Sequence, residues 1–300
     1  MEYAHVLGWC VELIRAAAIV TTDTISIDQD SRYGRAKNRI PWAEQQNLGN
    51  KAFNDALLIE RGVYALLKHY FGSSASLYFE PIATAQRNRA VGRTLGYSLM
   101  NYEEVKSRNF LVKSMYLVYF HEFFSPQKKN RLDYYDFNNW KTLTRCHVSQ
   151  TNYCLPISLA MNLAGLHDVK LHALAHTILH QMGYYVELHR DLRNCFVETD
   201  GTDIEDGRLT WLISVALQRG TPAQKEILQA NYGIPDADKV EAVKGVYKEM
   251  KLKRGLEGYI SETREDILRR IQGISKLDKA GISHEFFFKL MENMDFHNIS

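Results

Sequence analysis

An all-α helical bundle is the fold class that this sequence predicts, and three observations predict it. Apolar residues recur at three- and four-residue spacings through most of the 300 residues, whereas alternating strand patterns are rare. The breaks in this pattern, such as 72–74 and 220–222, are short. Segment 155–166 is apolar around most of its circumference, as an interior helix is. We therefore expect a single domain over residues 1–300, with helices enclosing a central cavity.

The individual helices are predicted by runs in which apolar residues fall on one helical face. The expected helical segments are, in chain order, 52–60, 63–67, 155–166, 171–188, 209–217 and 240–250. Glycine, proline or serine lies in each of the main breaks between segments, so each segment has a physical reason to end.

Composition excludes several classes of protein. The 37 Lys and Arg against 35 Asp and Glu give a formal net charge of +2, so no basic field indicates a nucleic-acid partner. The four cysteines show no CxxC pair, which predicts free thiols in a reducing compartment. Charged residues, among them Glu12 and Arg15, interrupt the apolar N-terminal segment. We expect no signal peptide, no stable membrane insertion and a cytoplasmic location, with a removed mitochondrial transit peptide as the alternative.

The first polar cluster contains Asp23, Asp28 and Asp30 and is followed by Arg32 and Arg35. Carboxylates next to arginines suit Mg²⁺ that holds a diphosphate, because the oxygens bind the metal and the guanidinium groups bind phosphate. The alternative is a solvated helix end, which is the commoner origin of such clusters.

The second polar cluster contains Asp191, Asn194 and Glu198, whose three- and four-residue spacing places them on one helix face. Acidic segment 201–206 follows directly. This pattern predicts three oxygen ligands for a metal, and the alternative is a polar helix end with ordinary ion pairs.

Two further groups favour structural roles. His172, His176 and His180 are spaced as in zinc-binding helices, but no HExxH motif is present and apolar residues surround them, so packed or solvated histidines are expected. Aromatic segment 116–124 is core by default, and it also suits the lining of a cavity that holds a carbocation.

Several segments resemble the farnesyl diphosphate synthase family. They are 7–12, 54–56, 155–156, Gly183, 201–206 with Trp211, and 231–233, in the family's order. The resemblance implies an isoprenoid synthase helical fold, a homodimer, a prenyl diphosphate substrate and up to three Mg²⁺ ions. It also implies that the family's first N-terminal helices are missing from this chain.

The departures from the family pattern fall on its binding segments. In the two DDxxD motifs the chain reads TDTIS at 22–26 and RDLRN at 190–194, and His147 aligns with the family's cavity lysine. The Gly-Gln-x-x-Asp segment aligns with 120–124, the Lys-Ile-Gly sequence before 201–206 is absent, and 295–300 replaces a basic tail. These losses weaken the isopentenyl diphosphate site most, because Coulomb attraction dominates there.

The resemblance assigns roles residue by residue. Catalytic roles fall on Asp23, Arg145, Arg190 and Asp191. Substrate binding falls on Ala17, Ala18, Arg32, Arg35, Phe120, His147 and Arg208. Metal binding falls on Asp23, Asp28, Asp191, Asn194 and Glu198.

Taken together, these residues predict a class I terpene synthase, because Asp191, Asn194 and Glu198 resemble the NDxxSxxxE pattern, with Arg190 replacing its first residue. Mg²⁺ would ionise the prenyl diphosphate, and the cation would cyclise. Ala17 and Ala18 align with two phenylalanines that limit chain length, so geranylgeranyl diphosphate is favoured and farnesyl diphosphate comes next. The alternatives are a non-catalytic paralogue and a prenyltransferase making farnesyl or geranylgeranyl diphosphate.

Overall fold

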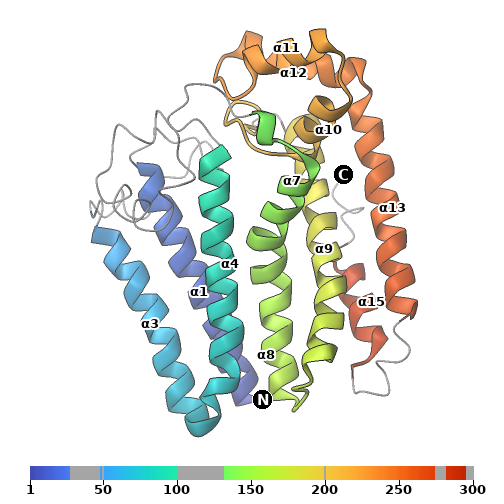
Figure 1. Ribbon diagram of the computed structural model, residues 1–300. Helices are drawn as coiled ribbons and strands as arrows, with labels where there is room; N and C mark the ends of the chain where they lie inside the picture. Colours follow the sequence, from blue (N-terminus) through green and yellow to red (C-terminus); the bar gives the residue numbers. More distant parts are fainter. Residues whose placement is uncertain (28–47, 49–50, 100–131, 199–200, 274–281, 295–300) are drawn as a thin grey trace.

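Long helices lie side by side along most of the molecule in the computed structural model (Figure 1). The structure describes residues 1–27, 48, 51–99, 132–198, 201–273 and 282–294. Within these ranges every regular element is helical and no strand occurs, which confirms the predicted all-α class. The expectation of one domain over 1–300 stays a prediction.

The described helices differ in length and kind, with α marking α-helices and η marking 3₁₀- or π-helices. They are α1 (Glu2–Ile27), α3 (Ala52–Phe71), η2 (Gly72–Ala75), α4 (Ser76–Leu99), η3 (Leu132–Tyr134), α7 (Phe137–Thr144), η4 (Arg145–Cys154), α8 (Leu155–Leu163), α9 (Val169–Phe196), α10 (Trp211–Arg219), α11 (Pro222–Asn231), α12 (Ala237–Glu249), α13 (Leu252–Gly273) and α15 (His284–Glu292).

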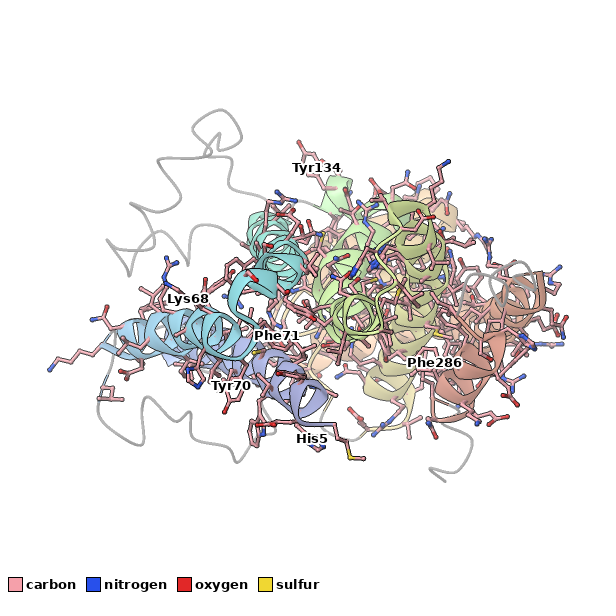
Figure 2. The ribbon with its side chains drawn as sticks, turned by 90° about the horizontal axis from the view of Figure 1, so that it is seen from below. His5, Lys68, Tyr70, Phe71, Tyr134 and Phe286 are labelled. Atoms are coloured by element: carbon pink, nitrogen blue, oxygen red, sulfur yellow. The ribbon has the colours of Figure 1, made fainter. Side chains whose placement is uncertain are left out.

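Helices α1, α3 and α4 form one side of the molecule around an apolar cluster that includes the fully buried Val63 and Leu67. The ring of Phe71, at the end of α3, packs against Tyr3 of α1 and Tyr78 of α4, with ring centroids 5.3 and 4.4 Å apart. Figure 2 looks along the helices and shows this corner at the end of α3. Packing of the Phe71 ring against the buried Tyr78 ring contributes to the angle at which α3 turns into α4.

A second apolar cluster lies between α7, α9 and the C-terminal helices α10 to α15, and includes the buried Trp140, Tyr185 and Tyr247. Helix α8 joins the two clusters, because Leu159 packs into the first and Met161 into the second. Helix α8 is therefore held from both sides.

The central helix changes its winding where the two sides meet. Residues 137–163 form one helical run, and its middle part, η4, is a π-helix that precedes Pro156. Helices α4 and α9 both pack closely on η4 through glycines. A Cβ atom at Gly92 would lie 2.6 Å from the Cβ of Cys146, and one at Gly183 would lie 2.9 Å from the Cα of Ser149. The widened turn thus requires a residue without a side chain on each neighbour.

Gly183→Ala is expected to lower the free energy of unfolding by about 1–3 kcal/mol, because the added methyl group meets the Ser149 backbone. Gly62→Ala in α3 is the control, since no atom lies within 4 Å of its added Cβ. Alanine there is expected to stabilise the helix by up to about 1 kcal/mol. Urea unfolding measures both. Equal stability of the Gly183→Ala and wild-type proteins would contradict the close approach.

We expected the N-terminal segment to contain no apolar run long enough to span a membrane, and helix α1 corrects this expectation. By length and hydropathy its segment Glu2–Thr21 is able to span a membrane, although charged residues interrupt it. In the structure this helix packs on α3 and α8, and Leu7, Cys10 and Ile14 are buried in the first apolar cluster.

Candidate functional site

The end of α9 carries a group of charged side chains that we call the Arg190 cluster: Glu187, Arg190, Asp191, Asp203 and Arg208. Helices α1, α4 and α9 all have their C-terminal ends at the end of the molecule where α10 to α12 lie (Figure 1). The first three cluster residues lie in the last turns of α9, and the other two lie in the loop before α10.

The guanidinium group of Arg190 bonds to three carboxylates at once. Its Nε donates to Glu187 Oε1 at 2.9 Å, and its Nη1 donates to both Asp203 oxygens, at 3.0 and 3.2 Å. Its Nη2 donates to Asp191 Oδ1 in a short hydrogen bond. The three carboxylate side chains are 10% exposed or less. Arg190 is therefore the cation around which they gather.

The loop at 201–210 positions Asp203 and Arg208. Gly207 has φ +64°, and its Cβ position is 3.0 Å from the Cα of Gly233, so the loop turns where a side chain would be strained. The hydroxyl of Tyr232 donates to the Arg208 carbonyl at 2.6 Å, and the hydroxyl of Tyr135 donates to the Gly207 carbonyl. Two buried tyrosines thus fix the loop over the end of α9.

Electrostatics in the cluster follow from burial and pairing. Although burial opposes it, the charges of Arg190 and Arg208 lower the pKa of Glu187. Burial raises the pKa of Asp191 to about 7, and the carboxylates of Glu187 and Asp203 act in the same direction, against Arg190. The pKa of Arg190 is raised by these carboxylates although burial opposes the rise. Arg190 therefore stays protonated, and its positive charge compensates the negative charge of the buried carboxylates.

The predicted metal face of Asp191, Asn194 and Glu198 is not assembled. Asp191 Oδ2 accepts the Trp211 backbone N–H at 2.7 Å, and Asn194 Oδ1 accepts the Asp203 N–H at 3.1 Å. The premise that Glu198 continues the helix is wrong, because α9 ends at Phe196 and Glu198 pairs with Arg193 at 3.0 Å. Among the described residues, no group of three or more His, Cys, Asp or Glu is arranged to hold a metal. These contacts do not fit Mg²⁺ at the second motif.

A second set of side chains, which we call the cationic group, connects α4 to η4 and the loop: Arg89, Arg93, His147 and Arg208. His147 is hydrogen-bonded to the Gly92 backbone, and the charges of Arg93, Arg89 and Arg208 act on its imidazole. The Arg93 guanidinium donates to the Ala18 carbonyl of α1 at 3.3 Å. The Nε of Arg89 is buried and has no hydrogen-bond partner among the described residues. Arg208 is also paired with Glu187 and Asp203, so Arg89 and Arg93 supply the positive charge for which the described residues show no ion pair.

Burial and neighbouring positive charges lower two pKa values in the cationic group, those of Arg89 and His147. Burial lowers the pKa of Arg89 to about 10, helped by the charges of Arg93 and Arg15. Burial lowers the pKa of His147 to about 4, and the arginines add to the effect. His147 is therefore neutral at neutral pH, as the sequence comparison with the family's lysine suggested. Sequence reasoning missed Arg89, Arg93 and Glu187. The four-residue spacing of the two arginines was the available signal, since it places them on one helix face.

Acid is expected to destabilise the fold through His147 and His180, because burial lowers both pKa values to about 4. The unfolded imidazoles take up protons near pH 6.5, so this stability is present above that pH and is lost as the pH falls toward 4. Each contributes up to about 2 kcal/mol between pH 7.5 and 5.

The measurement is urea unfolding at both pH values for the wild type and for His147→Gln. Asp191 shifts in the opposite direction, so the difference between the two proteins is the relevant quantity. The exposed His69 of α3 supplies the control variant His69→Gln. Equal pH dependence of the wild type and His147→Gln would contradict the buried neutral imidazole.

Other predicted site residues lie outside the Arg190 cluster and the cationic group. Arg145 is exposed at the start of η4, and its charge acts on Cys146, His180 and Tyr184. Ala17 is buried and Ala18 is half-buried on α1. Asp23 also lies on α1, but its side chain is outside the described part, as are Asp28, Arg32, Arg35 and Phe120 entirely.

The histidine column of α9 is packed. His176 Nε2 lies 2.7 Å from Ser158 Oγ, and His172 Nε2 lies 2.8 Å from the Leu166 carbonyl oxygen. His180 Nδ1 lies 3.8 Å from Cys154 Sγ. These partners account for the three imidazoles without a metal.

Comparison with known proteins identifies the family. The sequence pattern of the family described as polyprenyl synthetase matches residues 1–250. The chain belongs to this family. Among solved structures, the crystal structure of Trypanosoma brucei farnesyl diphosphate synthase superposes with a TM-score of 0.79 at 20% identity, over 96% of this chain and 77% of the other. The fold is that of the isoprenoid synthases, as the resemblance implied.

Relatives of this family member include farnesyl pyrophosphate synthases of two insects. The chain is 29% identical to that of Murgantia histrionica and 30% identical to that of Nezara viridula, over 98% and 97% of its own length. It spans 65% of the length of each. The rat enzyme of the same name is 29% identical over 97% of this chain and 74% of its own. These comparisons favour the prenyltransferase alternative over the terpene synthase interpretation.

Proposed function

We propose that this chain is a prenyltransferase-type polyprenyl synthetase that binds an allylic prenyl diphosphate and extends it with isopentenyl diphosphate, with farnesyl diphosphate as the product. The relatives named farnesyl pyrophosphate synthase support this reaction over cyclisation. Assembly as a homodimer and action in isoprenoid biosynthesis belong to the same proposal.

The observation that carries the proposal is the cationic group. A diphosphate carries several negative charges. Arg89 Nε is buried and has no hydrogen-bond partner among the described residues, and the Arg93 guanidinium donates to the Ala18 carbonyl. Guanidinium groups bind phosphate oxygens in a bidentate manner and retain their charge when partly buried. In the bond-breaking step they would stabilise the negative charge that develops on the leaving diphosphate.

Members of this family generally use Mg²⁺, which neutralises the diphosphate when it is bound. In this chain the carboxylates of the second motif are already bonded to Arg190. The residues left to hold such an ion are Asp23 and Asp28 of the first motif, and this assignment stays a prediction.

A second candidate function is a non-catalytic family member that binds a prenyl diphosphate without converting it. The Arg190 cluster favours this candidate, because an arginine stands where the family motif has its first aspartate. The two candidates share the binding step and differ in turnover.

The deciding experiment incubates the purified chain with geranyl diphosphate and labelled isopentenyl diphosphate, with and without Mg²⁺. Prenyl transfer predicts a product one isoprene unit longer, and Arg93→Gln is expected to lose it while Arg87→Gln, at an exposed position of the same helix, retains it. Calorimetric binding of geranyl diphosphate without product would establish the non-catalytic candidate. A hydrocarbon made from geranylgeranyl diphosphate alone would restore the terpene synthase interpretation.

A further inference from the structure

Three carboxylates at the end of α9 gather around one point. Glu187 and Asp191 come from one turn of α9, and Asp203 approaches from the loop, so three carboxylates from two segments converge. Their side chains are 10%, 0% and 8% exposed. Buried carboxylates in such a group repel one another unless a cation lies between them.

The guanidinium of Arg190 lies at this point and satisfies the group. Each of its three nitrogens donates to a different carboxylate, and the second oxygen of Asp191 is taken by the Trp211 N–H. Arg208 adds a second positive charge, 3.2 Å from Glu187 and 3.8 Å from Asp203. Two arginine charges thus face three carboxylates, and the oxygens that a metal would need are engaged.

We propose that Arg190 takes the place of a divalent cation in this chain, so that the end of α9 is a metal-independent centre, and that Glu187, Asp191 and Asp203 can gather around a divalent cation only when Arg190 is removed. The inference does not depend on the proposed reaction, because its readout is protein stability and metal binding.

The experiment titrates Mn²⁺, and in parallel Mg²⁺, into the metal-free wild type and into Arg190→Ala, and follows thermal unfolding by circular dichroism. For Arg190→Ala, metal at about 100 times its dissociation constant is expected to lower the unfolded-to-folded ratio about 100-fold. Arg190→Ala combined with Asp203→Asn is expected to lose most of this response. Arg193 lies one turn further along α9 and pairs with Glu198, so Arg193→Ala is expected to respond as the wild type does.

Each outcome bears on the proposal. If Arg190→Ala is unfolded without metal, Mn²⁺ is expected to restore its helical signal, and no recovery would overturn the proposal. Arg190→Lys retains a cation and is expected to show a smaller metal response than Arg190→Ala. Metal stabilisation of the wild type that Asp203→Asn abolishes would show that the cluster already binds metal, and would also overturn it. A wild-type response that Asp203→Asn leaves intact supports the proposal and points to the first motif.

Discussion

Arg190→Ala is expected to lower the free energy of unfolding by about 3–5 kcal/mol in metal-free buffer at neutral pH. The substitution leaves three buried carboxylates with only the partly exposed Arg208 as a cation. Removing one partner of a buried ion pair costs more than the pair itself contributes, because the remaining charges stay desolvated. Urea unfolding of the wild type and the variant measures the difference.

The pH dependence of Arg190→Ala provides a second signature. Without the guanidinium, the pKa values of the three carboxylates rise in the folded state. Their contribution to stability is then present at low pH and is lost as the pH rises through the folded values. Both proteins contain the buried histidines, so the variant is expected to lose less stability than the wild type between pH 7.5 and pH 5, because protonation of its unpaired carboxylates offsets part of the loss. Arg193→Ala, at a half-exposed ion pair, is expected to change stability by about 0.5 kcal/mol or less. A comparably small loss for Arg190→Ala would contradict the cluster.

Arg89→Gln combined with Arg93→Gln is expected to weaken the binding of a prenyl diphosphate about 100-fold or more. Charge-assisted hydrogen bonds to phosphate contribute about 1.5–3 kcal/mol each, and a tenfold change corresponds to about 1.4 kcal/mol. Isothermal titration with geranyl diphosphate measures the affinity. Rising ionic strength is expected to weaken wild-type binding more than binding by the variant.

The same double variant is expected to be as stable as the wild type or more stable. Burial and mutual repulsion already lower the pKa of Arg89 to about 10, so removal of the two charges relieves the repulsion between them. A loss of affinity without a loss of stability separates a binding role from a structural one. Arg87→Gln serves as the control on the same helix. Unchanged affinity of the double variant would refute the assignment of the diphosphate site to α4.

The sequence alone was sufficient for the fold class and the family, because both depend on patterns that neighbouring residues carry. The three- and four-residue spacing of apolar side chains predicts helices wherever it occurs, and α9 covers all of the predicted segment 171–188. The motif at 201–206 and the order of the other segments indicated the isoprenoid synthase fold. The replacement of the family's lysine by His147 was also predictable, because the loss of a charge follows from the identity of a single residue.

The arrangement of the site needed the tertiary structure. In the sequence, Arg190 is visible only as a replacement of the first residue of a metal-binding motif. The fold shows that its guanidinium reaches Asp203, thirteen residues away, in a loop that Tyr232 holds in place. Glu198 appeared to share a helix face with Asp191, but α9 ends at Phe196. Helical spacing predicts which residues share a face. It does not predict where a helix ends or which groups approach it from elsewhere in the chain, because burial and long-range pairing decide both.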